Sequence, residues 1–314
     1  MVSLLGGIFL GWSLGANDAS NVFGTAVSSK MLKFWTAAVL ASIFVILGAL
    51  ISGRAGIDTL SGLTAINLEQ AVISSVAAAA TVTIMTLLGL PVSTSQAVVG
   101  AILGIGILNR QLNLGGLGKV VLCWVGTPIG AAVIAVLLYH TLRVIYNRLS
   151  FNLFQSDMIL RLGLILAGSY GAYALGANNV ANVTAVFVGA GLITVAQAAL
   201  IGGFSIALGI LTYSRPVMET VGKKLVRLDP FSAFIVILSL AVTVHFYTLV
   251  GVPVSTSQAV IGGVLGIGIV KGVNTVSRKT LLNIVVAWVL TPVVACFIAL
   301  VIDFASHLKY IPMH

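Results

Sequence analysis

Charged residues are scarce in this chain. Aspartate and glutamate together number 7 and lysine and arginine 16 among 314 residues, while hydrophobic residues make up 59%. The mean hydropathy is +1.15. A water-soluble protein of this size needs far more polar surface, so these values exclude a soluble globule and indicate an integral membrane protein whose main partner is the lipid bilayer.

Other residue types that define familiar sites are also few. The two cysteines, Cys123 and Cys296, lie inside apolar runs without metal-type spacing, and the four histidines share no spacing. We therefore expect no cysteine or histidine metal site. The formal charge is +9, but the basic residues lie in the links between apolar runs, so we expect no nucleic-acid partner.

Apolar windows of roughly 20 residues, the length that crosses a hydrocarbon core of about 30 Å as a helix, recur along the chain. They are continuous and do not alternate with a period of two, which favours helices over a strand barrel. The predicted fold is all-α. The windows are 3–27, 34–53, 71–90, 93–109, 119–142, 159–189, 192–212, 232–250, 255–270 and 280–304.

An internal repeat organises these windows. The octapeptide PVSTSQAV occurs at 91–98 and again at 253–260, and the motif GANDASN at 15–21 has the counterpart GANNVAN at 176–182. The offsets of 162 and 161 residues barely differ, so the chain is one duplicated unit. We predict a first membrane repeat at 1–150 and a second at 151–314. Glycines after each octapeptide, among them Gly100 and Gly262, are expected to be helix-packing positions.

The distribution of basic residues predicts how the repeats are oriented. If the segment after each octapeptide crosses the membrane, each repeat has five crossings, the repeats are inverted, and an external N-terminus leaves 12 of the 16 basic residues in the cytoplasm. If that segment is re-entrant, the division is 7 against 9. The positive-inside rule favours the inverted arrangement, in a multi-pass protein of the plasma or inner membrane with its N-terminus outside. Inverted repeats with broken helices or helical hairpins at mid-membrane are typical of secondary transporters.

Asp18 falls near the middle of the first apolar window, where an unpaired carboxylate costs roughly 2.5 to 3.5 kcal/mol. The helix-weakening Gly15 and the polar residues around Asp18 indicate a broken helix that lines a cavity. Carboxylate and amide oxygens are ligands that small cations prefer. The predicted cation ligands are Asn17, Asp18, Asn21, Asn178, Asn179 and Asn182.

The octapeptides have the features of an anion site. Pro91 and Pro253 suit the start of a helix, whose first turn offers free N–H groups and the positive end of the helix dipole. The residues that would bind the anion are Ser93, Thr94, Ser95, Gln96, Ser255, Thr256, Ser257 and Gln258. No lysine or arginine occurs in either segment, so the balancing charge must come from cations bound nearby. This deficit predicts symport of a cation and an anion.

The GANDxxN and GANNxxN motifs, together with PVSTSQ in each half, resemble those of the inorganic phosphate transporter (PiT) family. The resemblance covers essentially the whole chain and implies phosphate as substrate, moved with sodium or protons. It assigns phosphate to the eight octapeptide residues and cations, most simply sodium, to the six residues of the Asn/Asp motifs. Larger members carry a long soluble loop that this chain lacks.

Rival functions differ in what they require. A membrane enzyme would need a second aspartate or a serine with a base, but Asn179 stands where a second aspartate would be, so no enzyme is expected. A passive anion channel and proton-coupled transport of phosphate or metal phosphate remain as alternatives to sodium symport by alternating access. A homodimer is kept as a candidate assembly.

Overall fold

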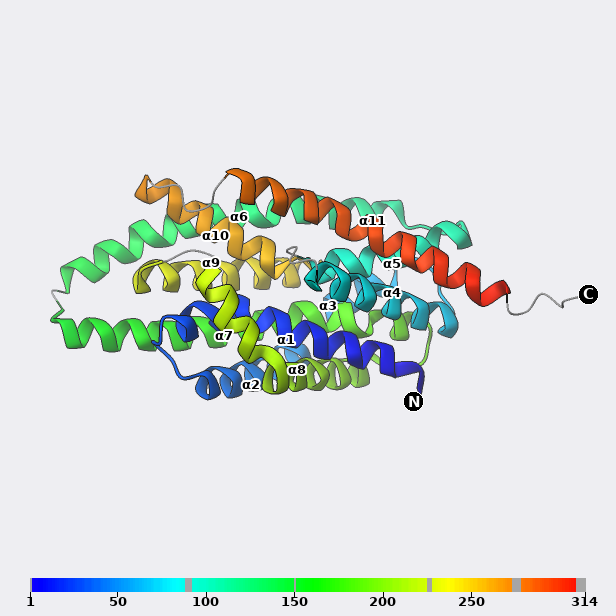
Figure 1. Cartoon of the computed structure of the whole chain (residues 1–314), viewed down its shortest axis with the longest axis horizontal. Coiled ribbons are helices and arrows are strands. Elements are labelled where there is room, and N and C mark those ends of the chain that lie inside the picture. Colours follow the sequence, from blue (N-terminus) through cyan, green and yellow to red (C-terminus); the bar gives the residue numbers. More distant parts are fainter. Residues whose placement is uncertain (1, 88–91, 150, 225–227, 273–277, 309–314) are drawn as a thin grey trace, which may run out of the picture.

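The computed structural model describes residues 2–87, 92–149, 151–224, 228–272 and 278–308. Within these ranges every regular element is helical, as predicted (Figure 1). After the short 3₁₀ turn η1 (Val2–Leu4), the helices are α1 (Leu5–Ser28), α2 (Phe34–Ser52), α3 (Arg54–Ser61), α4 (Leu68–Leu87), α5 (Thr94–Asn109), α6 (Leu114–Arg148), α7 (Leu153–Gly189), α8 (Val195–Lys224), α9 (Pro230–Leu249), α10 (Thr256–Lys271) and α11 (Arg278–Leu308).

Seven of these helices, α2, α4, α6, α7, α8, α9 and α11, are long and apolar enough to cross a bilayer. Helices α5 and α10 are apolar but have only 16 residues each. The all-α, multi-pass membrane architecture is therefore confirmed. Apolar windows alone do not show whether the two short helices cross the bilayer or fold back beside the preceding helix.

Each octapeptide lies at the tip of a helical hairpin. The start of α4 meets the end of α5, where the Gln70 side-chain amide donates to Asn109 Oδ1 at 2.9 Å. In the same way the start of α9 meets the end of α10 through the ion pair between Asp229 and Lys271. Figure 1 shows the α4–α5 hairpin in the right half of the molecule and the α9–α10 hairpin in the left half. The segment after each octapeptide thus returns beside the helix that precedes it.

The two halves of the sequence interlock. Helix α1 packs mainly on α8 and α2 on α7, while α5 packs on α11 and α10 on α6. Glycines allow the closest approaches: a Cβ on Gly15 would lie 2.0 Å from the Ile206 carbonyl oxygen, and one on Gly176 would lie 2.0 Å from that of Val45. These contacts are spaced by the same 161 residues as the motifs, so both copies of the repeat use one packing solution.

The expectation of broken helices at the Asn/Asp motifs is wrong. Helices α1 and α7 run without interruption through Asp18 and through Asn178 to Asn182. The Asp18 carboxylate accepts from side chains of α7 and α10, so the backbone of α1 does not have to open to compensate it. Gly15, which suggested a helix break, instead provides the contact surface for α8.

The glycines after the octapeptides do act as predicted. A Cβ on Gly100 would lie 2.3 Å from the carbonyl oxygen of Pro292 in α11, and one on Gly262 would lie 2.2 Å from that of Pro128 in α6. Without side chains at these positions, α5 and α10 approach the long helices of the opposite half closely. These two contacts hold α5 against α11 and α10 against α6, and the hairpin tips face the centre of the protein.

Helix α3 was not predicted. It follows α2 after Gly53, and Ile57 and Leu60 on its inner face are fully buried. A Cβ on Gly56 would lie 3.2 Å from Ala181 Cβ and 3.4 Å from Pro253 Cγ, so α3 covers the tip of the second hairpin. The second half has no separate counterpart, because α8 continues through Pro216 to Lys224.

Replacing Gly15 by alanine should destabilise the protein. The new methyl group would overlap the Ile206 carbonyl, and overpacking of this kind costs about 1–3 kcal/mol. Gly118→Ala in α6 is the matched control, since no atom lies within 4 Å of its Cβ position. Thermal unfolding in detergent should show a lower midpoint for Gly15→Ala only. Equal midpoints for the two variants would contradict the close contact between α1 and α8.

The base of the second hairpin should be sensitive to acid. Burial would raise the pKa of Asp229, but hydrogen bonds from Lys271 and Ser232 outweigh it and hold the pKa below the ordinary value of 3.8. A depressed carboxylate pKa stabilises the fold above the unfolded-state pKa, and the contribution is lost as pH falls through the folded-state value. The stability difference between wild type and Asp229→Ala should therefore be constant from neutral pH down to about 4 and shrink in stronger acid. Asn109→Ala, in the uncharged base of the first hairpin, should show no such change.

Candidate functional site

Both pairs of repeated motifs meet in the interior. The Asn/Asp motifs of α1 and α7 lie against the N-terminal ends of α5 and α10, where the hairpin tips converge. Asp18 is only 5% exposed, and Asn178, Asn179 and Asn182 are each 1% exposed. Most octapeptide side chains are similarly buried, with Ser257 partly exposed. The described conformation therefore encloses most of the polar residues that the sequence selected, while Asn17, Asn21 and Ser257 are partly exposed.

The octapeptides form the expected helix N-termini. Ser93 and Ser255 are the N-cap residues of α5 and α10, and their side chains accept the backbone N–H groups of Gln96 at 3.4 Å and Gln258 at 3.3 Å. Pro253 lies two residues ahead of its N-cap, in non-helical backbone, rather than inside the helix. Pro91 falls outside the described residues. The two buried helix starts present a positive dipole end and free N–H groups to the centre of the protein.

The two hairpin tips are bonded to each other. Ser95 Oγ of the first donates to the carbonyl oxygen of Val254 in the second at 3.0 Å. The equivalent Ser257 Oγ donates to the Val92 carbonyl oxygen at 3.4 Å. Ser257 also shares a hydrogen bond of 2.9 Å with Ser255. The crossed serine bonds bring both octapeptides into one site.

Asp18 supplies the negative charge of the site. Its Oδ2 accepts from Thr256 Oγ1 and from Asn179 Nδ2, both at 3.1 Å. Asn21, on the same helix and partly exposed, donates to Thr256 Oγ1 at 3.1 Å. The four ion pairs among the described residues all lie elsewhere. The carboxylate is therefore held by neutral donors from the other half of the sequence.

The asparagines of α7 form a continuous network. Asn179 Oδ1 accepts from Asn178 Nδ2 at 3.0 Å and from Asn182 Nδ2 at 2.9 Å. Asn182 also donates to Ser95 Oγ at 2.9 Å, which links the network to the first hairpin. Asn178 extends it to the second hairpin through Val254. One set of side chains on α7 thus reaches both hairpins.

Several buried oxygen atoms in the site have no hydrogen-bond partner. They are Thr94 Oγ1, Gln96 Oε1, Asn182 Oδ1 and Gln258 Oε1, four of the nine such side-chain atoms found in the described part of the chain. Unsatisfied buried polar groups are costly and rare in proteins. Asn17, the remaining predicted ligand, is partly exposed; its backbone oxygen accepts from Ser20 Oγ at 2.7 Å, and no hydrogen bond from its side chain to another described residue is found. Buried oxygen atoms without a hydrogen-bond partner suit a ligand that donates hydrogen bonds or is itself a cation.

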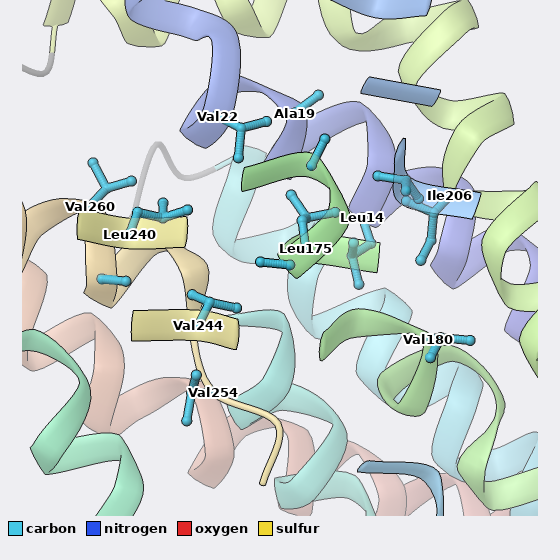
Figure 2. Packing of buried hydrophobic residues seen from close by; sticks show 14 of the residues in the cluster. Leu14, Ala19, Val22, Leu175, Val180, Ile206, Leu240, Val244, Val254 and Val260 are labelled. Carbon is cyan, nitrogen blue, oxygen red and sulfur yellow. The ribbon is translucent and has the colours of Figure 1, made fainter. Parts of the chain in front are cut away.

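Apolar side chains pack close to the motifs along the chain. Leu14 and Val22 flank the motif of α1 and Leu175 precedes that of α7, and Figure 2 shows them in one cluster with Leu240 and Val244 of α9. All five are at most 1% exposed. Such a shell strengthens electrostatic interactions within the site because it lowers the local dielectric constant.

Sequence reasoning missed the backbone groups of Val92 and Val254 and the cover formed by α3. The valines carry no chemical signal, since only their peptide groups take part. Helix α3 is short and contains Arg54 and Asp58, so it resembles a polar link in hydropathy.

Removing the Thr256 hydroxyl should weaken the protein before any ligand is added. Thr256→Val keeps the shape but deletes a hydrogen bond to the Asp18 carboxylate, a loss of about 1.5–3 kcal/mol for a charged partner. Thr94→Val is the matched variant in the other repeat, where the hydroxyl has no protein partner. Unfolding in phosphate-free buffer should be easier for Thr256→Val only. An equal loss of stability in both variants would contradict the difference between the bonded hydroxyl of Thr256 and the unbonded hydroxyl of Thr94.

Comparison with known proteins identifies the class of protein. The model of the phosphate transporter family matches residues 14–299, so the chain belongs to that family. Together with the helical fold, this makes the protein a multi-pass membrane transporter rather than an enzyme, as the motifs predicted.

Particular relatives cover nearly the whole chain. A protein of Methanocaldococcus jannaschii assigned as a phosphate permease is 32% identical over 302 residues, which cover 96% of each chain. The sulfate permease CysP of Bacillus subtilis is 30% identical and aligns over 93% of this chain and 84% of its own length. A solved structure described as the sodium-dependent phosphate transporter has the same fold, with a TM-score of 0.85, 24% identity and 98% coverage of both chains.

Proposed function

We propose that the protein is a secondary active transporter that moves inorganic phosphate together with sodium by alternating access. The observation that carries this proposal is the meeting of two buried helix N-termini with a buried carboxylate and an asparagine network. Phosphate would occupy the space between the octapeptides, held by N–H groups and hydroxyls. Sodium would bind the oxygen atoms of the Asn/Asp motifs.

Charge balance supports coupling. None of the described site residues pairs with lysine or arginine, and Asp18 adds a further negative charge. A divalent anion in such a site would be strongly disfavoured unless cations accompanied it. Among the buried oxygen atoms without a partner, Asn182 Oδ1 belongs to the Asn/Asp motifs and is a suitable ligand for such a cation. Binding of one ion would thus favour binding of the other, which is the basis of symport.

Alternating access would follow from inverted repeats. In this proposal each hairpin enters and leaves at one end, so α1, α2 and α6 in one half, and α7, α8 and α11 in the other, provide an odd number of crossings per repeat. Basic residues of the links then lie on the same sides as predicted from the sequence, with the N-terminus outside a cell membrane. The hairpins would open the site to opposite sides in turn.

Sulfate is the second candidate substrate, because one relative is named as a sulfate permease. Asp18 favours phosphate on chemical grounds. Its carboxylate lies one hydrogen bond from the first residue of α10, where the anion would bind. Hydrogen phosphate can donate a proton to such an acceptor, whereas sulfate has no proton at neutral pH and would be repelled.

A carrier fits the burial of the site better than a channel. A channel requires a continuous pore, whereas Asp18, Gln96 and Gln258 are each at most 5% exposed. Proton coupling would have to act through Asp18, the one ionisable side chain in the described network. The homodimer stays a prediction.

Uptake into proteoliposomes tests the proposal. Radiolabelled phosphate should accumulate above equilibrium when an inward sodium gradient is imposed, and accumulation should stop when choline replaces sodium at fixed pH. Excess sulfate should compete poorly. Asp18→Asn should abolish sodium-driven accumulation, because the one negative charge among the bonded site residues is lost.

Controls separate the alternatives. Unchanged uptake in choline, combined with accumulation driven by a pH gradient, would establish proton coupling. Equilibration without accumulation would establish a channel, and sulfate accumulation in place of phosphate would reassign the substrate.

A further inference from the structure

We propose that Asn178 is a positioning residue that clamps the backbone of the second hairpin, not a cation ligand like its neighbours. The inference rests on the proposed function, because it assigns a role within the same transport site. It concerns one peptide group, that of Val254, and one side chain on α7.

The geometry is that of a side chain imitating a backbone partner. The backbone N–H of Val254 donates to Asn178 Oδ1 at 2.8 Å, and Asn178 Nδ2 donates to the Val254 carbonyl oxygen at 2.8 Å. An amide side chain that binds both groups of one residue replaces the two bonds that a neighbouring strand would make. Val254 immediately precedes Ser255, the N-cap of α10. Its orientation therefore sets where the helix start points.

The hydrogen-bonding capacity of Asn178 is largely used by this contact. Its second N–H donates to Asn179 Oδ1 at 3.0 Å, and its oxygen faces a peptide N–H. A cation at Asn178 Oδ1 would have to approach beside that N–H dipole, whose positive end repels it. The side chain is 1% exposed, so water cannot replace the bond to Val254 if it breaks.

The equivalent residue in the first repeat differs. Asn17 is partly exposed, and no side-chain hydrogen bond to another described residue is found for it. Val92, the counterpart of Val254, accepts from Ser257 Oγ at 3.4 Å, as Val254 does from Ser95, but no bond from Asn17 to it is found among the described residues. The two asparagines occupy the same place in the repeat but have different surroundings, so changes at Asn17 and at Asn178 should have different effects.

The clamp also explains a coupling between the hairpins. The same Val254 carbonyl oxygen accepts from Ser95 Oγ at 3.0 Å, so Asn178 and the first hairpin share one acceptor. Loss of the clamp would leave the peptide free to rotate and would misplace both the cap of α10 and the contact with Ser95. Anion binding would suffer, while oxygen atoms elsewhere in the network would still be available to sodium.

Asn178→Asp distinguishes the two roles. A cation ligand should tolerate or gain from the carboxylate, whereas a clamp should fail, because a carboxylate oxygen would replace the N–H donor and face the Val254 carbonyl. Sodium and phosphate affinities are measured by the shift in melting temperature in detergent, first as sodium chloride is added alone and then as phosphate is added at a fixed, saturating sodium concentration. We expect phosphate affinity to fall about tenfold or more, as for loss of one buried hydrogen bond, with the sodium response retained. Asn17→Asp, the equivalent change at a residue that stays a proposed cation ligand, should instead alter the sodium response, because it adds a carboxylate to the proposed cation site.

Tighter sodium binding with unchanged phosphate affinity in Asn178→Asp would overturn the proposal. Hydrogen exchange on the unmodified protein provides a second measurement if the variant does not fold. The amide of Val254 should be protected in choline buffer without sodium or phosphate, since Asn178 alone holds it. Exchange at the rate of an open loop until sodium is added would equally refute the clamp. Because this measurement needs no transport, failure of phosphate uptake by the wild type would leave its result intact.

Discussion

The fold depends on keeping one carboxylate, Asp18, inside an apolar protein without a basic partner. Charges at membrane depth are expensive unless neutral donors or bound ions compensate them. Here Thr256 and Asn179 supply the donors from the second half of the sequence. The carboxylate therefore binds the two repeats together, and any movement that separates α1 from α10 must first replace these hydrogen bonds with others.

In the proposed transport site, helix N-termini would take the place of arginine and lysine. A fixed basic side chain would hold an anion tightly in every conformation, whereas helix dipoles attract it more weakly and from both hairpins at once. In the proposed mechanism an anion bound alone would leave an uncompensated charge, and co-bound cations would remove it. A carrier must release its substrate, so a site whose affinity depends on a second ion suits transport better than a permanent ion pair.

The sequence predicted the helical membrane fold, the duplication and the residues that meet in the centre, because motif spacing and hydropathy depend on residue identity. It did not predict unbroken helices at the Asn/Asp motifs, since Gly15 and Asp18 suggest a break when considered alone. The partner of Gly15 is the Ile206 carbonyl and that of Asp18 is the Thr256 hydroxyl, and both lie far along the chain in the second repeat. For the same reason the sequence did not decide whether the segment after each octapeptide crosses the membrane or folds back, since the pairing of Gln70 with Asn109 is a tertiary contact. Helix α3 was missed because its amphipathic sequence resembles a link.

The repeats are similar but not identical, and the differences are concentrated where the site is closed. Pro253 is covered by α3, while the corresponding part of the second repeat continues as the end of α8. Asn178 holds Val254 by two bonds, while Asn17 holds no described partner through its side chain. Two copies of one sequence in different local structures are what a two-state carrier requires, since exchanging these structures between the copies would open the opposite side. In the proposed alternating access, the hairpin that is clamped and covered would mark the closed side, and the contacts of α3 and Asn178 would form and break in each cycle.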